Sequence, residues 1–369
     1  MKNTLTGDLS NLFHDCHFID VRAPTEFVKG TIQNSVNLPI MNNDERQRVG
    51  KCYKQEGNDV ATRLGYKLTA AHKKSRVQAW VDFANSHPGK TYIYCWRGGQ
   101  RSHIAQEWIK EAGVDIPLIA GGFKRIRNYL INYLDTKALE NTYLVISGRT
   151  GTGKTLLLNK ITQKIDLEGL ANHKGSSFGR QVEPQPTQIN FEHAIATELL
   201  NLQKNVPIIV EDESSNIGSV SIPRKIFDVI HESPVILLEE SIENRVKVII
   251  DDYILGLSKN YIIAHSESGY RLYSEHLTSA LSRVSKRLGG VLYSQLSGQL
   301  KSSLEIQERT GEVMQHESWI VPMLVNYYDK MYDYQFKKRN RKVLVKGDPA
   351  TLEEYIQNYQ LNYSINRDK

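Results

Sequence analysis

Residues 143–158 read YLVISGRTGTGKTLLL, and this stretch decides the fold. Tyr143–Ser147 is rich in β-branched and aromatic residues, which favours a short strand. Leu156–Lys164 has the apolar spacing of a helix. Between them, Gly148–Thr155 matches the pattern GxxxxGK[ST] in full. A strand that passes through a glycine-rich loop into a helix opens an α/β domain with a parallel sheet.

The glycine-rich loop has the composition of a phosphate cradle. Backbone amides at Gly148, Gly151 and Gly153 can surround a diphosphate, Lys154 can bind its outer phosphate, and the Thr155 hydroxyl can ligand Mg²⁺. We therefore predict a diphosphate site at this P-loop. The sequence offers no NKxD motif for reading guanine, which disfavours a plain GTPase.

An acidic run completes this prediction. Glu211-Asp212-Glu213 directly follows the strand-like Val206–Val210. P-loop proteins use an acidic side chain at the end of a neighbouring strand to hold Mg²⁺. Glu211 and Asp212 are therefore the candidates for this role, and Thr155 and Asp212 are the predicted Mg²⁺ ligands. The alternative is a solvated acidic strand end. No tightly bound cofactor is expected.

A second anion-binding loop lies upstream. Thr91–Cys95 is strand-like, Trp96–Arg101 (WRGGQR) is a loop, and Ser102–Ala112 has helical spacing. Inward-turned amides, a helix N-terminus and the charges of Arg97 and Arg101 all favour a thiolate at Cys95. Cys95, Arg97 and Arg101 are thus the predicted catalytic residues; a buried, inert cysteine is the alternative. Cys16 and Cys52 lack such a setting and are predicted to be structural.

The rest of the chain predicts an α/β protein of several domains. Further strands are expected at His17–Val21, Pro117–Ala120, Val206–Val210 and Pro234–Glu239. A long loop at Gly169–Asn190 follows the P-loop helix and is expected to close over the diphosphate or the substrate, with an ordinary surface insertion as the alternative. Phe123–Leu139 is helical and is predicted to bridge two domains. The predicted divisions are a parallel-sheet domain (1–125), a helical linker (126–140), a P-loop α/β domain (141–268) and a mostly helical C-terminal region (269–369). That region is expected to end with a strand at Lys342–Lys346 and a helix near Leu352–Tyr359.

Composition narrows the class of protein. The chain has 369 residues, a formal net charge of +6 and three cysteines without a CxxC pair, which excludes the common zinc frameworks and a disulfide scaffold. The N-terminus lacks the apolar region of a signal peptide, and no run reaches the length of a membrane span. We expect a cytoplasmic protein with no membrane partner.

A basic segment near the C-terminus is the predicted RNA contact. Lys337-Lys338-Arg339-Asn340-Arg341-Lys342 follows a tyrosine-rich helix, and Arg283–Arg287 (RVSKR) is a second basic patch. Basic charge interleaved with aromatic rings suits phosphate contacts and base stacking. The alternative is a solvated basic face with tyrosines in a core. The predicted contacts are Lys337, Lys338, Arg339, Arg341 and Lys342.

The first domain resembles the rhodanese family. The resemblance rests on Asp20-Val21-Arg22, Glu26-Phe27, Gly30, Ile32, Asn37, Pro39 and the loop Cys95–Ser102. In that family the loop cysteine carries a transferable sulfur as a persulfide. Asp20, Arg22 and Glu26 are predicted to be scaffold, since charged residues beside a strand end usually pair to fix a loop. Arg101 lies six positions after Cys95, one more than in plain sulfurtransferases of the family, so the wider cradle favours a larger anion.

Further segments are similar to the bacterial tRNA 2-selenouridine synthase family. They are Met41–Tyr53, Tyr94–Ser102, Leu167–Arg180, Gln185–Glu192 and Glu211–Gly218. The resemblance implies a two-step edit of wobble 2-thiouridine in tRNA. Geranyl diphosphate first caps the sulfur, and selenium from selenophosphate then replaces it. Cys95 either carries selenium covalently or helps to bind selenophosphate. The enzyme that supplies selenophosphate is a further candidate partner.

Two other functions fit the same loops. One is a P-loop kinase or NTPase with a regulatory rhodanese module, and the other is a nucleic-acid-binding protein whose loops bind anions without turnover. Stimulated ATP or GTP hydrolysis favours the first, and tRNA binding without any change in its nucleosides favours the second.

Overall fold

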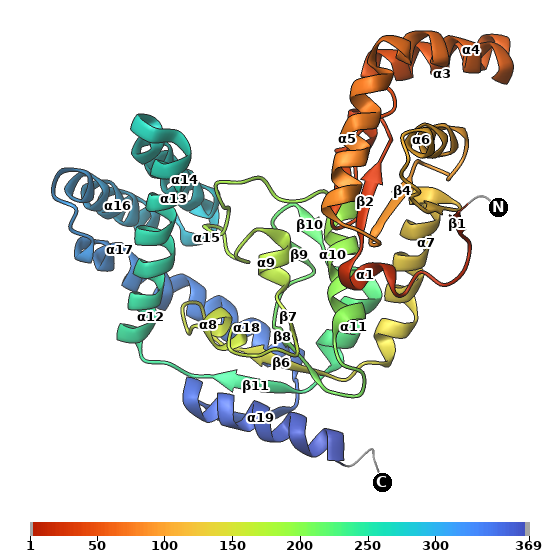
Figure 1. Cartoon of the computed structure of the whole chain (residues 1–369). Helices are drawn as coiled ribbons and strands as arrows, with labels where there is room; N and C mark the ends of the chain where they lie inside the picture. The colour runs from red at the N-terminus through yellow and green to blue at the C-terminus, as the bar shows by residue number, and fades with distance from the viewer. Residues whose placement is uncertain (1–2, 366–369) are drawn as a thin grey trace. The chain divides into compact units, whose positions relative to one another are not determined.

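The computed structural model describes residues 3–365, which divide into two compact units (Figure 1). We call them the cysteine unit and the P-loop unit. The cysteine unit comprises the described residues up to Ala138 together with Thr187–Asn201. The P-loop unit comprises Leu139–Pro186 and the described residues from Leu202 onward. The chain therefore leaves the cysteine unit, returns to it for one helix, and leaves it again.

The cysteine unit is built on a five-stranded sheet in the order β1-β5-β4-β2-β3, in which every pair is parallel. Its strands are β1 (Thr4–Leu5), β2 (His17–Asp20), β3 (Ser35–Asn37), β4 (Thr91–Tyr94) and β5 (Leu118–Ile119). Its helices are α1 (Leu12–Asp15), α2 (Pro24–Phe27), α3 (Asn43–Glu56), α4 (Asn58–Thr69), α5 (Lys73–Ser86), α6 (Gln100–Glu111), α7 (Gly122–Asp135) and α10 (Gln188–Asn201). The predicted parallel sheet is confirmed.

Helix α7 is part of the core of the cysteine unit. Phe123, Ile126, Leu130 and Leu134 recur at helical spacing and are all buried. Helix α10 packs against α7, and Arg127 of α7 pairs with Glu192 of α10 at 2.8 Å. The helix that was expected to bridge two domains therefore has a packing role within one unit.

The P-loop unit contains a second five-stranded parallel sheet in the order β12-β11-β6-β8-β7. Its strands are β6 (Tyr143–Ser147), β7 (Lys164–Ile165), β8 (Ile208–Glu211), β11 (Val235–Leu238) and β12 (Val343–Gly347), beside a small antiparallel pair, β9 (Asn216–Ile217) and β10 (Val220–Ser221). β6 is central, with β8 and β11 as its neighbours. The α/β class predicted from Tyr143–Leu158 is confirmed.

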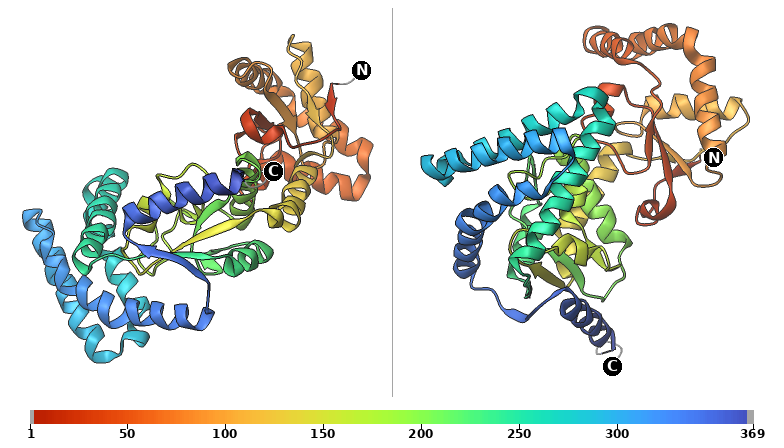
Figure 2. Two further views of the ribbon diagram at one scale, coloured as in Figure 1. Left: turned by 90° about the horizontal axis from the view of Figure 1, so that it is seen from below. Right: turned by 90° about the vertical axis from the view of Figure 1, so that its left-hand side faces the viewer.

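The C-terminal region is mostly helical, as predicted, but it also completes the P-loop sheet. Strand β12 pairs with β11, and α19 (Pro349–Ile365) packs on both strands (Figure 2). Leu352 and Ile356 of α19 are fully buried in the same core as Leu144 and Ile146 of β6. The last part of the chain therefore stabilises the strand that leads into the P-loop.

In the described part of the chain, the P-loop unit has ten further α-helices, and the later ones form a separate apolar cluster. The ten are α8 (Lys154–Leu158), α9 (Leu167–Ala171), α11 (Arg224–Glu232), α12 (Ile242–Ile249), α13 (Leu257–His265), α14 (Gly269–Arg283), α15 (Ser285–Leu288), α16 (Gly290–Thr310), α17 (Glu317–Met323) and α18 (Asp329–Arg339). The cluster itself is drawn from α12 and the helices after it. Two π-helical segments, η3 (Ile250–Gly256) and η6 (Leu324–Tyr328), interrupt it. Among residues 3–365, no helix combines the length and apolar character needed to cross a membrane.

Helix α8 is shorter than predicted. The pattern suggested a helix to Lys164, but α8 ends at Leu158. Beyond it the chain turns, and Lys164–Ile165 pairs as β7 with the edge of β8. Strand pairing in the sheet has overridden the local helical spacing.

Candidate active site

The cysteine loop connects β4 to α6, and its backbone is fixed by the start of α7. The amide of Phe123 donates to the carbonyl of Cys95 at 2.9 Å, and that of Lys124 donates to the carbonyl of Trp96 at 3.0 Å. Gly98 has a φ of +60°, and a Cβ there would lie 2.5 Å from the carbonyl oxygen of Ile119. Only glycine fits this position, so the tight loop depends on Gly98 and on Gly121 and Gly122, whose backbone lies against it.

The Cys95 thiol lies inside this loop. The residue is 3% exposed, and the Ser102 hydroxyl donates to its sulfur at 3.2 Å. Cys16, Cys52 and Cys95 are all free, in agreement with the expectation of no disulfide scaffold. Of the three, Cys95 combines a glycine-rich loop with a hydroxyl donor to sulfur. Such a donor is suited to stabilising negative charge on the sulfur.

The arginines of the loop differ in their environment. Arg97 is exposed, whereas Arg101 donates to both carboxylate oxygens of Glu26, at 2.6 and 3.2 Å. Burial alone would raise the pKa of Glu26, but the hydrogen bonds and charge of Arg101 hold it below its usual value. The charge of Arg101, which was expected to favour a thiolate, is therefore largely balanced by Glu26 in this structure.

Two of the three residues expected to be scaffold, Asp20 and Arg22, lie in the interior, whereas Glu26 is partly exposed. Asp20 and Arg22 form a buried ion pair at 2.6 Å, and Arg22 also donates to the carbonyl of Gly30 at 2.7 Å. The Arg22 guanidinium lies 3.9 Å from the centroid of the Phe123 ring. These contacts hold β2 and the start of α7 together beside the cysteine loop.

A cavity of about 390 Å³ opens beside the cysteine loop. Trp96 and Phe123 form one wall, stacked with ring centroids 5.3 Å apart. Cationic side chains from Arg22, Arg46 and Arg101 also line it. Aromatic faces next to cations suit a nucleobase together with a phosphate or a similar anion.

The P-loop runs from β6 to α8 as predicted. Gly151 and Gly153 have φ values of +82° and +81°, which allow the loop to curl around an anion. The Lys154 amine donates to the carbonyl of Gly148 at 2.9 Å, and so lies across the loop. The Thr155 hydroxyl donates to Glu211 at 2.8 Å. Gly148, Gly151, Gly153, Lys154 and Thr155 all line one cavity.

Two arginines that were not predicted fasten the P-loop to α18. Arg245, which is 3% exposed, donates to the carbonyl of Thr150 at 2.9 Å and pairs with Asp329 at 2.6 Å. Arg149 pairs with Asp333, one helical turn further along, at 2.8 Å. Asp329 and Asp333 share a helix face because they are four residues apart. The sequence signal for this contact is Arg245, which stands among the apolar residues of α12, because a buried arginine needs a polar partner.

The structure separates the two acidic candidates. Glu211 ends β8 next to β6 and faces Thr155, whereas Asp212 accepts hydrogen bonds from Arg339 at 3.0 Å and from Arg341 at 2.8 Å. The Ser147 hydroxyl also donates to Asp212. The prediction of Asp212 as a metal ligand is corrected, because its carboxylate is already engaged by two arginines. Glu211 takes its place beside Thr155.

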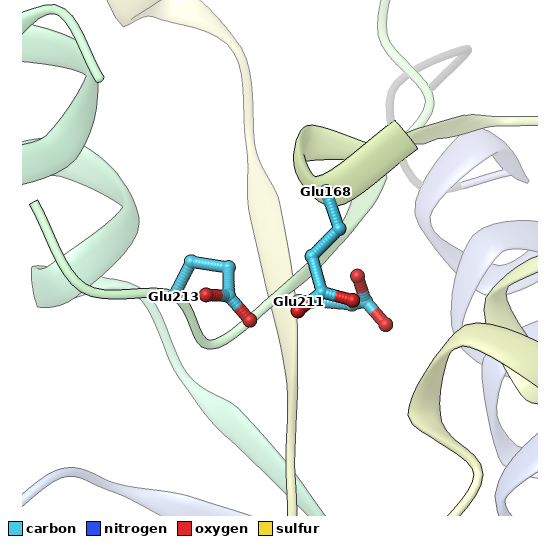
Figure 3. A group of neighbouring side chains, drawn as sticks. All are labelled: Glu168, Glu211 and Glu213. Atoms are coloured by element: carbon cyan, nitrogen blue, oxygen red, sulfur yellow. The ribbon is translucent and has the colours of Figure 1, made fainter. Parts of the chain in front are cut away.

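Glu211 belongs to a group of three carboxylates. Glu168 of α9, Glu211 and Glu213 each place an oxygen within 4.8 Å of the others (Figure 3). Burial, followed by the charge of Glu168, raises the pKa of Glu211 to about 8. Burial and both neighbouring carboxylates also raise the pKa of Glu213 well above its usual value. Three carboxylates so close together cannot all be ionised without a compensating cation.

This group fits a divalent cation. Glu211 is fully buried, and its second carboxylate oxygen has no hydrogen-bond partner. Hard cations such as Mg²⁺ bind carboxylate and hydroxyl oxygens. Glu168, Glu211, Glu213 and Thr155 together supply that donor set, next to the loop that cradles an anion. Sequence reasoning named Thr155 and Glu211 but missed Glu168, which no local motif marks.

The P-loop cavity holds about 380 Å³ and has two kinds of lining residue. The polar ones come from the P-loop, from the carboxylates of Glu168, Asp212 and Glu213, and from part of the predicted loop Gly169–Asn190. That segment, which also contains the end of α9 and the start of α10, contributes Lys174 and Gly175–Ser177 to the cavity, and its closing over a ligand stays a prediction. The apolar and aromatic ones are Leu156, Val248, Ile249, Tyr253, Val284, Tyr327, Tyr328, Met331, Tyr332 and Phe336, and the same segments also contribute Asp252, Arg287, Gln335 and Arg339.

The basic segment divides into outward and inward residues. Lys337, Lys338 and Lys342 are exposed. Arg341 is 4% exposed and binds Asp212 and the carbonyls of Ile230 and Ser233, so its prediction as a tRNA contact is corrected. Arg339 is partly exposed and shares Asp212 with Arg341. The lysines remain predicted contacts for tRNA.

Comparisons with known proteins agree with both units. A model described as the tRNA 2-selenouridine synthase AAA domain matches residues 141–363, and the rhodanese-like domain model matches residues 5–129. The tRNA 2-selenouridine synthase of Marinobacter nauticus is 42% identical over 95% of this chain and 96% of its own length. Proteins of that name from Pseudomonas savastanoi pv. phaseolicola and Shewanella sediminis are 42% and 41% identical, over 95% and 92% of this chain and 97% and 93% of their own lengths.

Proposed function

This chain belongs to the tRNA 2-selenouridine synthase family, and we propose that it converts wobble 2-thiouridine of tRNA to 2-selenouridine in two transfers. It is a transferase acting on tRNA. In the first transfer, geranyl diphosphate caps the sulfur. In the second, selenium from selenophosphate replaces the capped sulfur.

The observation that carries the proposal is the two-sided P-loop cavity. The phosphate cradle and the carboxylates of Glu168 and Glu213 line the same space of about 380 Å³ as a set of aromatic and apolar side chains, and Glu211 lies next to those two carboxylates. A prenyl diphosphate has the same two-sided character, with an anionic head and a hydrocarbon chain. The amides of Gly151 and Gly153 and the amine of Lys154 would stabilise the departing diphosphate.

The first transfer forms a carbon–sulfur bond. The thiocarbonyl sulfur of 2-thiouridine attacks C1 of the geranyl chain, the C1–oxygen bond breaks, and the N3 proton of the base is released as diphosphate leaves. Lys154 and the loop amides would stabilise the negative charge that develops on the diphosphate. A divalent cation bound by Glu211, Glu168 and Thr155 would supply further positive charge at the same oxygens.

The second transfer is assigned to the cysteine loop. Selenium adds at C2 of the base while the geranylated sulfur departs as geranyl thiol, and hydrolysis of the selenium–phosphorus bond releases phosphate. Arg97, Arg101 and the loop amides would bind selenophosphate. Cys95 would help to fix selenophosphate in the loop without a covalent bond, because an S–Se bond formed from selenide-level selenium would need a two-electron oxidant that this reaction does not supply. The cavity beside the loop, with Trp96 and Phe123, has the character required for the uridine.

One experiment tests the function. Full-length protein is incubated with tRNA containing wobble 2-thiouridine, geranyl diphosphate, selenophosphate and Mg²⁺, and the digested nucleosides are weighed by mass spectrometry. We expect geranylthiouridine when selenophosphate is omitted and selenouridine when it is present. Turnover of ATP or GTP that tRNA stimulates, with no modified nucleoside, would instead identify a P-loop NTPase.

A further inference from the structure

A small apolar chamber adjoins the P-loop cavity and has no role in the reaction described above. It holds about 30 Å³ and shares Thr150, Ser176, Ile249, Tyr253 and Tyr328 with the larger cavity. Beyond this shared boundary its wall is formed by Phe178, Trp319, Ile320, Met323 and Leu324. All five of these side chains are buried. The chamber is thus the apolar end of a space that begins at the phosphate cradle.

The shape of the backbone is unusual at this chamber. The two π-helical segments of residues 3–365, η3 and η6, both contribute to it. η3 supplies Tyr253, and η6 supplies Leu324 and Tyr328. π-helical turns are rare and occur mostly at functional sites, because the inserted residue weakens the helix unless something is gained. Their coincidence here points to a built binding site rather than a packing defect.

The wall of the chamber is held in place by polar contacts behind it. Tyr328 and Tyr253 hydrogen-bond through their hydroxyls to Ser177 at 2.9 Å and to Ser176 at 3.3 Å. Trp319 donates to Nδ1 of His316 at 2.9 Å and stacks on Phe178 with ring centroids 5.7 Å apart. The polar edges of these aromatic residues are therefore already occupied.

This chemistry disfavours a nucleobase as the occupant. A base needs hydrogen-bond partners for its edges, and burying them unpaired costs free energy. The five residues beyond the shared boundary offer one polar side-chain group, the indole N–H of Trp319, and His316 already accepts it. A hydrocarbon chain carries no such requirement and gains from leaving water.

We propose that this chamber receives the far end of the prenyl chain and limits its length. The inference rests on the proposed function, since it assumes that a prenyl diphosphate binds with its head in the P-loop. The chain lies along the apolar wall of the cavity, past Ile249 and Tyr253, and ends against Leu324 and Trp319. The buried side chains at this end leave only about 30 Å³, so the chamber would not hold a further isoprene unit and would select against farnesyl diphosphate.

The test is a change in chain-length preference. Leu324→Ala enlarges the chamber, and we expect the ratio of farnesyl to geranyl transfer, measured as kcat/KM on 2-thiouridine tRNA, to rise at least tenfold. Leu300→Ala is the matched control, because Leu300 is equally buried in the same apolar cluster but lines neither cavity. Its ratio should stay within about twofold of the original. Leu324→Val, a smaller truncation, should shift the ratio in the same direction and serves if Leu324→Ala does not fold.

The results separate a failure of the chain-length proposal from a failure of the proposed function. If the unmodified protein geranylates tRNA but the Leu324 variants keep its chain-length ratio, the chamber does not set chain length and the inference is wrong. If the unmodified protein transfers no prenyl group, and geranyl diphosphate binds no more tightly than inorganic diphosphate, the proposed function itself fails. An equal shift in the Leu300 variant would also overturn the inference, because general loosening of the core would then explain the change.

Discussion

The two loops of this enzyme balance charge in opposite ways. In the cysteine loop, Glu26 pairs with Arg101, and the buried Asp20 pairs with Arg22, so each acid has its cation. Beside the P-loop, Glu168, Glu211 and Glu213 lie close together, and the charge of Lys154 partly opposes the rise in the pKa of Glu211. In the first site each of these acids is paired with an arginine, whereas in the second the carboxylates compete and the pKa values of Glu211 and Glu213 are raised. We therefore propose that a divalent cation can replace a proton in the P-loop site.

The largest effect should come from removing the thiol. We expect Cys95→Ala to reduce selenation by at least about 1000-fold, because the anion-binding loop loses the sulfur at its centre, while geranylation continues. The measurement is the ratio of geranylthiouridine to selenouridine after digestion of tRNA. Cys52→Ala, which removes another buried free thiol, is the control and should leave both products unchanged. Normal selenation by Cys95→Ala would show that the two loops do not divide the reaction as proposed.

Lys154→Ala should produce the converse defect. Loss of the amine that meets the leaving diphosphate should slow geranylation by about 100- to 1000-fold. Selenation of tRNA that already carries geranylthiouridine should be retained. The matched control is Lys160→Ala, because Lys160 lies on the surface and pairs with Glu353. Equal loss of both steps in Lys154→Ala would argue against separate sites.

The excess of carboxylates should appear as a pH dependence of stability. Because the pKa of Glu211 is raised to about 8, the folded protein keeps a proton that the unfolded chain releases above about pH 4.5. Stability without metal should therefore fall as pH rises from about 5 to 8. Glu211→Gln should flatten this decline, which thermal unfolding at several pH values measures.

Added Mg²⁺ should reverse the trend, because the cation replaces the proton. The stabilisation that Mg²⁺ provides should grow with pH and should weaken in Glu211→Gln, with tighter binding at pH 8 than at pH 6. Asp212→Asn serves as the contrasting variant, since Asp212 faces arginines rather than the carboxylate group. If the stabilisation by Mg²⁺ did not depend on pH or on Glu211, the Mg²⁺ would have to bind at another site.

The smallest effect should concern tRNA affinity. Replacing Lys337, Lys338 and Lys342 with Gln should weaken tRNA binding and reduce the slope of log affinity against log salt, by up to about 0.9 for each phosphate that a lysine no longer neutralises. Arg341→Gln should instead destabilise the fold, by up to about 3 kcal/mol, because it removes a buried partner of Asp212. Unchanged affinity and salt slope in the lysine variant would place the tRNA-binding surface elsewhere.

Sequence reasoning succeeded where the signal was local. The strand, glycine loop and lysine of Tyr143–Thr155 form one continuous motif, and Cys95–Ser102 forms another, so their positions in the fold could be predicted. The parallel sheets followed from the order of the strands. The chain also carries its family resemblance in such continuous segments.

The errors arose where distant contacts decide the outcome. Asp212 and Arg341 both looked available for ligands, yet they bind each other across 129 residues of sequence. Glu168 joins Glu211 only because α9 packs beside the end of β8, which no spacing along the chain reveals. Helix α10 was not predicted, and its residues were assigned to the P-loop domain, whereas the structure places Thr187–Asn201 in the cysteine unit through its packing against α7.

The placement of α10 has a consequence for how the protein is made. The cysteine unit lacks one of its core helices until residue 201 has been synthesised, and by then β6 and the P-loop have already emerged from the ribosome. A protein cut after Ala138 would expose the surface of α7 that α10 covers, and would lose the partner of Arg127. The cysteine unit should therefore fold late during translation, and an isolated N-terminal fragment should gain stability when a peptide spanning residues 187–201 is added.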